Sequence, residues 1–146
     1  MPGNLAAVQA VFFVVLLFAV SVFDLRQRII PDTLNLAIAA SALLCFSPAQ
    51  LWGVFIALPF LLAAVLCGGI GGGDIKLMAA CGLLLGLPKG ILAAAAGLSL
   101  LLLYAAIYRI VCRVRGREAV KAFPLAPFLS AGCLFAYFMT MKGLII

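Results

Sequence analysis

The sequence predicts an all-α membrane protein, a bundle of about six transmembrane helices, and three observations lead to that fold class. Of the 146 residues, 68% are hydrophobic and 10% are charged, whereas a soluble domain has roughly 45–50% and about 25%. The mean hydropathy is +1.35. The hydrophobic residues also form long runs, separated by short gaps rich in charge, glycine or proline. These features exclude a soluble domain and a disordered chain.

The apolar runs give six predicted spans and leave no room for a second domain, so residues 1–146 are expected to form a single membrane-embedded domain. The spans are residues 5–23, 33–46, 50–67, 74–87, 90–111 and 124–146. The first ten residues contain no Lys or Arg, so the first run is read as a retained span, not a signal peptide. The second and fourth runs are only about 14 residues long. As helices they reach about 21 Å, less than the roughly 30 Å hydrocarbon core, so they extend further or one is re-entrant.

The basic residues support the count of six spans. With six spans, the side that receives most of them holds Arg26, Arg28, Lys76, Arg109, Arg113, Arg115, Arg117 and Lys121. The other side holds only Lys89 and Lys142. The positive-inside rule therefore places the first group in the cytoplasm and both chain termini outside. Because these residues lie in gaps between apolar runs, they indicate contact with the lipid bilayer and exclude a nucleic-acid partner.

Two aspartates carry the candidate chemistry. The chain has no histidine, and its five cysteines form no C-x-x-C pair, so no metal site and no cofactor are predicted. Asp24 closes the first span and Asp74 opens the fourth, on the same side of the bilayer. Two neighbouring carboxyl groups hold one proton between them, so one can accept a proton from water while the other donates one. This is the chemistry of an aspartic protease, and it needs neither histidine nor metal.

The glycine run before Asp74 is predicted to line a cavity beside the aspartates. Gly71-Gly72-Gly73-Asp74 reads G-x-G-D, and Gly71 and Gly73 are expected to let the backbone approach a neighbouring chain or a substrate closely. Irregular backbone at membrane depth is tolerated where protein or water covers it. Neither a Walker loop nor a dinucleotide-binding loop fits the residues that follow the glycines.

Three further residues are predicted to support the site. Pro31 stops any helix that precedes it, and Asp32 or Thr33 is expected to cap the second helix. For Asp32, support of the site and direct participation are the alternatives. Lys76 is expected to anchor its helix to lipid headgroups, with tuning of the aspartates or holding of a substrate carbonyl as alternatives. Glu118 is read as a partner of the arginines next to it.

Three segments resemble the type IV prepilin peptidase family, in the family's order along the chain. Residues 24–32, DLRQRIIPD, are similar to its first motif, residues 71–77, GGGDIKL, to its G-x-G-D motif, and residues 123–129, FPLAPFL, to the opening of its last span. The resemblance implies a membrane aspartic endopeptidase in which Asp24 and Asp74 are catalytic. It also implies cleavage of the short basic leader of prepilin-like or pseudopilin precursors, at the cytoplasmic face of a prokaryotic cytoplasmic membrane.

The chain resembles the short members of the family that serve tight-adherence (Flp-type) pili. Larger bifunctional members carry a cytoplasmic segment with paired C-x-x-C motifs, which this sequence lacks, so N-methyltransferase activity is not expected. Two alternatives stay open: an ion- or proton-coupled transport component, and a catalytically silent scaffold of a pilus or secretion assembly. The sequence does not indicate an oligomeric state.

Overall fold

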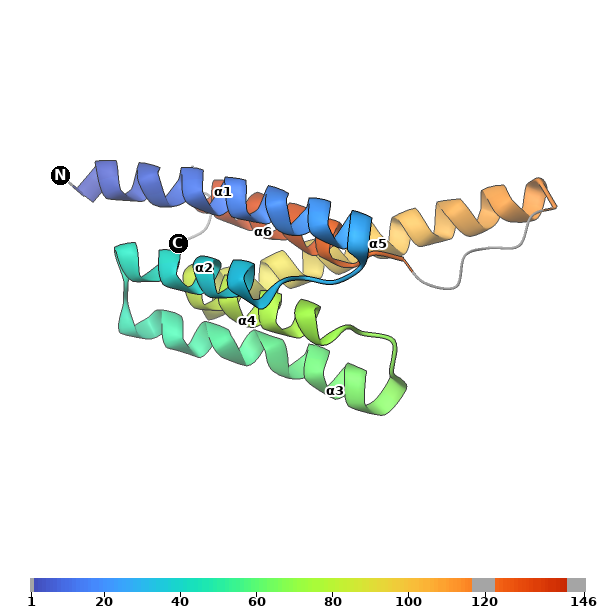
Figure 1. The fold of residues 1–146 in the computed structure, drawn as a ribbon, viewed down its shortest axis with the longest axis horizontal. Helices are drawn as coiled ribbons and strands as arrows, with labels where there is room; N and C mark the ends of the chain where they lie inside the picture. The colour runs from blue at the N-terminus through green and yellow to red at the C-terminus, as the bar shows by residue number, and fades with distance from the viewer. Residues whose placement is uncertain (1, 117–122, 142–146) are drawn as a thin grey trace.

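The computed structural model describes residues 2–116 and 123–141, and the regular structure in them is helical. In chain order the elements are α1 (Pro2–Gln27), α2 (Asp32–Ala42), the 3₁₀ helices η1 (Leu43–Cys45) and η2 (Pro48–Ile56), α3 (Ala57–Cys67), α4 (Gly72–Leu85), α5 (Leu87–Val114) and α6 (Ala126–Met141). Successive segments run back and forth along one bundle axis (Figure 1). The predicted all-α membrane fold is confirmed.

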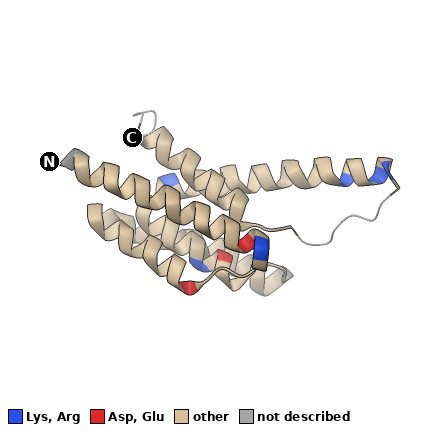
Figure 2. Ribbon diagram, turned by 45° about the horizontal axis from the view of Figure 1, so that its top comes forward, with Lys and Arg blue, Asp and Glu red and all other residues tan. Residues whose placement is uncertain are grey.

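The alternating course gives the bundle two ends that matter for function. At one end α1 finishes and α2, α4 and α6 begin (Figure 1). We call this the carboxylate end, because the described acidic residues, drawn red in Figure 2, lie there. At the opposite end α4 finishes at Leu85 and α5 begins at Leu87. The C-terminal part of α5 projects well beyond the carboxylate end of the bundle (Figure 1).

Among the described residues, three helical stretches are long and apolar enough to cross a bilayer: Asn4–Gln27, Pro48–Leu66 and Leu87–Val114. Asp32–Cys45 and Ala126–Thr140 are shorter apolar helices. The central α4 has 14 residues, or about 21 Å at 1.5 Å per residue, so the fourth run is short as expected. Full crossing by the shorter helices, and the outside location of both termini, stay predictions.

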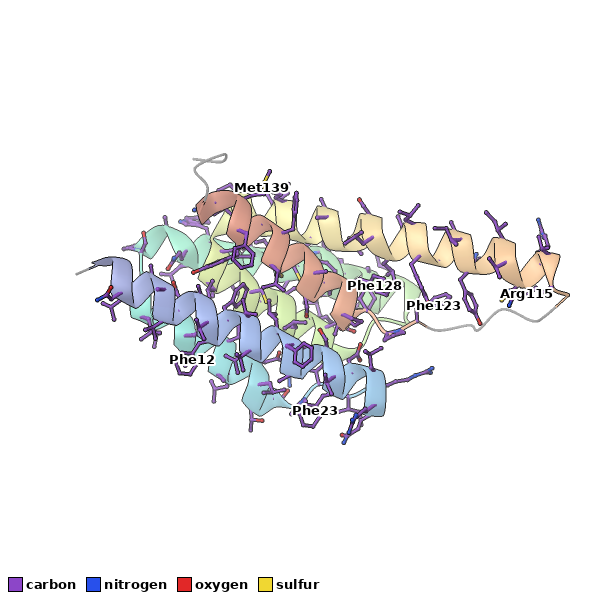
Figure 3. All side chains as sticks on the ribbon, turned by 90° about the horizontal axis from the view of Figure 1, so that it is seen from above. Phe12, Phe23, Arg115, Phe123, Phe128 and Met139 are labelled. Atoms are coloured by element: carbon purple, nitrogen blue, oxygen red, sulfur yellow. The ribbon has the colours of Figure 1, made fainter. Side chains whose placement is uncertain are left out.

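The bundle is apolar both inside and outside. On α1 the fully buried Phe13, Leu17 and Val20 recur every three or four residues, so they share one helix face. The equivalent inner face of α4 carries Leu77, Met78 and Cys81, and that of α6 carries Leu129, Cys133 and Ala136. These side chains belong to a single core cluster. On the outside, Phe12 points away from the bundle and is 56% exposed (Figure 3), as a lipid-facing side chain would be.

Glycines set how closely the central helices approach. A Cβ at Gly53 of η2 would overlap the carbonyl oxygen of Gly82 in α4, and a Cβ at Gly82 would overlap that of Gly53. On the other side, a Cβ at Gly132 of α6 would overlap the carbonyl of Ala93 in α5. Small residues at such crossings allow backbone-to-backbone contact between membrane helices. These contacts hold α4 and α6 at the positions that build the site.

Several predicted boundaries need correction. Helix α4 begins at Gly72 and ends at Leu85, and the next residue, Gly86, has φ = 79°, a conformation that suits glycine. The expected terminator Pro88 instead lies in the first turn of α5, where its missing N–H has no helical partner to lose. The third run begins as the 3₁₀ helix η2. Arg117, Glu118, Lys121 and Lys142 lie outside the described residues.

Replacing Gly82 with valine should destabilise the bundle, because the new Cβ would collide with the Gly53 backbone. Overpacking of this kind costs about 1–3 kcal/mol. Thermal unfolding of the purified protein in detergent measures the effect. Gly72→Ala is the control, since nothing lies within 4 Å of a Cβ at that position. Equal melting temperatures for the two variants would contradict the packing described.

Candidate functional site

Asp24 reaches the interior because it continues the buried face of α1. It follows Val20 by one helical turn and is only 6% exposed. One of its carboxylate oxygens, Oδ2, accepts a hydrogen bond of 3.1 Å from the backbone N–H of Ala126, the first residue of α6. The first N–H groups of a helix have no intrahelical partner, and the helix dipole favours a negative charge there. Asp24 therefore caps α6 from a position 102 residues earlier in the chain.

Asp74 lies in the first turn of α4 and is 9% exposed. Its backbone N–H donates to the carbonyl of Gly71 at 3.1 Å. Its side-chain oxygen Oδ1 is buried and has no hydrogen-bond partner among the described residues. Buried polar atoms are rarely left unpaired, and unpaired ones cluster at functional positions. Asp74 therefore has hydrogen-bonding capacity that the surrounding helices do not use.

The two carboxylates meet in one cavity of about 230 Å³ at the carboxylate end. The cavity is lined by Asp24, Arg28, Ile29, Ile30, Asp32, Gly71, Gly72, Gly73 and Asp74. All of these residues come from two short segments, residues 24–32 and 71–74. The structure thus brings together the two stretches that the sequence analysis singled out separately.

The motif glycines have different surroundings. A Cβ at Gly73 would lie 3.0 Å from the Cβ of Ile30, so glycine at this position lets α4 start directly against the segment before Pro31. A Cβ at Gly71 would lie 3.3 Å from Oδ2 of Asp74, and nothing lies within 4 Å of one at Gly72. The expected close approach to a neighbouring segment therefore holds at Gly73, whereas Gly71 lies near a side chain of its own motif. Gly72 faces open space along the cavity wall.

The predicted capping role of Asp32 is wrong. The residue that precedes α2 in the N-cap position is Pro31, and no side chain caps this helix. Both carboxylate oxygens of Asp32 instead accept hydrogen bonds from the Lys76 ammonium, at 2.8 and 2.7 Å. Lys76 is thus engaged with a protein carboxylate in the structure. This ion pair ties the start of α2 to the start of α4, and Asp32 also lines the cavity.

The sequence analysis did not identify three groups that contribute to the site: two side chains and one backbone N–H. Asn35, 6% exposed, donates from Nδ2 to the carbonyl of Gly73 at 3.4 Å, and its Oδ1 has no partner in the described part of the chain. In the sequence, Asn35 could have been noticed because it is a single amide side chain inside an apolar run. Arg28 lines the cavity and adopts a left-handed backbone conformation, φ = 52°, which is uncommon outside glycine. The third contributor, the N–H of Ala126, has no side-chain signal.

Within residues 2–116 and 123–141, no three His, Cys, Asp or Glu side chains gather as a metal ion would require. The cavity is lined by the buried carboxylates of Asp24 and Asp74, the exposed Asp32, one arginine and a glycine-rich wall. The N-terminus of α6 donates to Asp24. Fold and site together define a class: helical membrane proteins in which two buried carboxylates line one cavity.

Comparison with known proteins assigns the chain to a family. Residues 11–113 match the model of the type IV leader peptidase family, and the chain belongs to this family. It is similar to the prepilin leader peptidase/N-methyltransferase of Bacillus subtilis (strain 168), with 36% identity over 146 residues. That match covers 92% of this chain and 56% of the relative, so the chain spans little more than half the relative's length. No solved structure matches the chain significantly.

Removing the Asp24 carboxylate should lower the stability of the protein, whereas removing that of Asp74 should not. Asp24→Ala removes the cap of α6 and should destabilise the protein by about 1 kcal/mol. Asp74→Ala removes a carboxylate with a buried, unpartnered oxygen, and it should not destabilise the protein, because functional groups are often held at a cost in stability. Thermal unfolding in detergent compares the two variants with the parent. A larger loss for Asp74→Ala than for Asp24→Ala would contradict these assignments.

The Asp32–Lys76 pair should contribute little to stability. Its side chains are 70% and 58% exposed, and exposed ion pairs are worth about 0.2–1 kcal/mol. A double-mutant cycle with Asp32→Asn and Lys76→Gln should give a coupling energy in that range. A coupling free energy well above about 1 kcal/mol would contradict this prediction and show that the ion pair is a major stabilising contact between α2 and α4.

Proposed function

We propose that the protein is a membrane aspartic endopeptidase that removes the leader from prepilin-like precursors, with Asp24 and Asp74 as its catalytic residues. The observation that carries the proposal is the meeting of these two carboxylates in one cavity. Membership of the type IV leader peptidase family supports the reaction class. The name of the Bacillus subtilis relative supports prepilins as the substrate class.

The proposed reaction needs only the two carboxyl groups, which share one proton. The ionised carboxylate takes a proton from water as the water oxygen attacks the scissile carbonyl carbon. The protonated carboxyl donates its proton to the carbonyl oxygen, giving a tetrahedral diol. When the C–N bond breaks, a proton passes to the leaving amine, which becomes the new N-terminus of the mature protein. General acid and base steps of this kind each contribute about 10²–10⁴-fold to the rate.

The surroundings of the two residues suggest which group begins in which state. The Ala126 N–H and the positive end of the α6 dipole favour a negative charge on Asp24. A buried oxygen without a hydrogen-bond donor, such as Oδ1 of Asp74, favours a neutral carboxyl. We therefore assign Asp24 as the group that activates water and Asp74 as the first proton donor. Arg28, which lines the same cavity, can hold a substrate carbonyl.

Charge placement supports an active site at the cytoplasmic face of the membrane. Arg26 and Arg28 lie at the carboxylate end, next to Asp24. The projecting part of α5 carries Arg109 and Arg113 beyond that same end (Figure 2). Among the described basic residues, Lys89 lies at the opposite end. Basic residues concentrate on the cytoplasmic side of membrane proteins, so the cavity would open where a cytoplasmic leader meets the bilayer.

The arrangement of the acidic residues favours hydrolysis over transport. A proton or ion pathway needs ionisable groups along its length. In the described part of the chain, the aspartates gather at one end, and the core cluster between the ends is apolar. The proposal concerns the peptidase reaction alone, and the prediction that methyl transfer is lacking stays a prediction.

Cleavage in membranes tests the assignment. A prepilin-like substrate is co-expressed with the parent protein, Asp24→Asn or Asp74→Asn, and its size shift is followed. Each substitution should reduce cleavage by roughly 10³-fold or more, since a catalytic pair acts as a unit. Asp32→Asn is the matched control. It removes a carboxylate from the same cavity wall but breaks only an exposed ion pair, so cleavage should fall by less than about tenfold.

Each variant must be present in the membrane at the level of the parent. Continued cleavage by Asp24→Asn or Asp74→Asn would refute the site assignment even though the family is established. If the parent cleaves no prepilin-like substrate, the proposed function itself fails, and the transport or scaffold hypothesis takes its place.

A further inference from the structure

A second cavity, of about 190 Å³, lies at the end of the bundle opposite the aspartates. Six elements contribute to its walls, namely α1, η1, η2, α4, α5 and α6. Its lining residues are Ala6, Gln9, Cys45, Gln50, Leu84, Leu85, Lys89, Tyr137 and Thr140. This cavity shares no residue with the carboxylate site, and the proposed reaction does not use it.

The cavity contains a positive charge that is not paired with any carboxylate of the described residues. Lys89 is partly buried, and among the described residues the one ion pair is that between Lys76 and Asp32. The described aspartates all lie at the other end of the bundle (Figure 2). Lys89 also belongs to the first turn of α5, where backbone N–H groups lack helical partners and the helix dipole is positive. Because the Lys89 ammonium and the helix N-terminus are both positive, an anion bound beside them would be stabilised.

Tyr137 provides a second, independent indication of a ligand. It is more than nine-tenths buried, with 8% of its surface exposed, and it lines the cavity. Its ring packs against Phe13 with centroids 5.3 Å apart. Its hydroxyl donates no hydrogen bond to any described residue. A buried tyrosine hydroxyl normally has a partner.

Two glutamine side chains are fixed as walls of the same cavity. Gln9, 5% exposed, donates from Nε2 to the carbonyl of Ser41 at 3.0 Å. Gln50 donates to the carbonyl of Leu84 at 3.3 Å and accepts from the N–H of Ser47 at 3.0 Å. The two amides are therefore held in place by backbone groups. The Lys89 ammonium and the Tyr137 hydroxyl are the donors in the cavity wall best suited to a charged ligand.

We propose that this cavity is a binding site for a phosphate group, supplied by the headgroup of an anionic phospholipid. A phosphate carries negative charge and several acceptor oxygens, so it can accept from Lys89 and Tyr137 together. The cavity lies at the helix ends, where a bilayer places its headgroups. Free phosphate shares this chemistry, and the experiment distinguishes the two sources.

Thermal unfolding of the purified full chain in a neutral detergent tests the proposal. The probes are dioleoylphosphatidylglycerol, dioleoylphosphatidylcholine and sodium phosphate, each compared with sodium chloride at equal ionic strength. Phosphatidylglycerol should raise the melting temperature of the parent, because a ligand that binds only the folded state stabilises it. In Lys89→Gln and in Tyr137→Phe, the lipid concentration needed for half of that shift should rise about tenfold, as expected for loss of one charge-assisted hydrogen bond.

Tyr137→Phe keeps the ring contact with Phe13, so it should fold as the parent does. Arg113→Gln removes an exposed positive charge from the far end of α5 and should leave the lipid response unchanged. A response to phosphatidylglycerol alone identifies the lipid headgroup as the ligand. An equal, Lys89-dependent response to sodium phosphate would overturn the lipid source. No shift with any phosphate compound, or the same response in parent and Lys89→Gln, would overturn the site.

Discussion

The apolar interior of the bundle is the constraint on which the rest of the structure depends. A polar group buried among apolar side chains costs free energy unless it is hydrogen-bonded. The inner face of α1 obeys this rule: three apolar side chains occupy its middle, and Gln9 and Asp24 lie at its two ends. Polar chemistry is thus displaced to the two ends of the helices. The carboxylate site and the cavity around Lys89 are the two results.

Much of the fold could be predicted because membrane helices are specified by composition and length. Gaps at Ser47-Pro48-Ala49 and at the glycine run separated segments that the structure also separates. Errors came where a residue has two possible roles. Pro88 can follow a helix or begin one, and only the positive φ of Gly86 shows that α4 has already ended. Aspartate is a common capping residue, but both carboxylate oxygens of Asp32 accept hydrogen bonds from Lys76 instead.

The two aspartate side chains of the candidate site could be picked out from the sequence, whereas its backbone contacts could not. Asp24 and Asp74 stood out because carboxylates are rare in an apolar chain, and the buried-face spacing of α1 and α4 points both inward. The Ala126 N–H could not be foreseen, because every residue except proline has an equivalent donor. The contact between Gly73 and Ile30 likewise depends on how α4 meets the segment before α2. Such information exists only once the helices have packed.

The bond between Asp24 and Ala126 also has a consequence for biosynthesis. Its partners are 102 residues apart, and ribosomes add about 5–20 residues per second. A nascent chain therefore carries Asp24 for about 5–20 s before its partner has been made. During that interval Asp74 has also been synthesised, but the first turn of α6 is missing from the wall of the site. The carboxylate site is completed only after α6 has been made, 102 residues after Asp24.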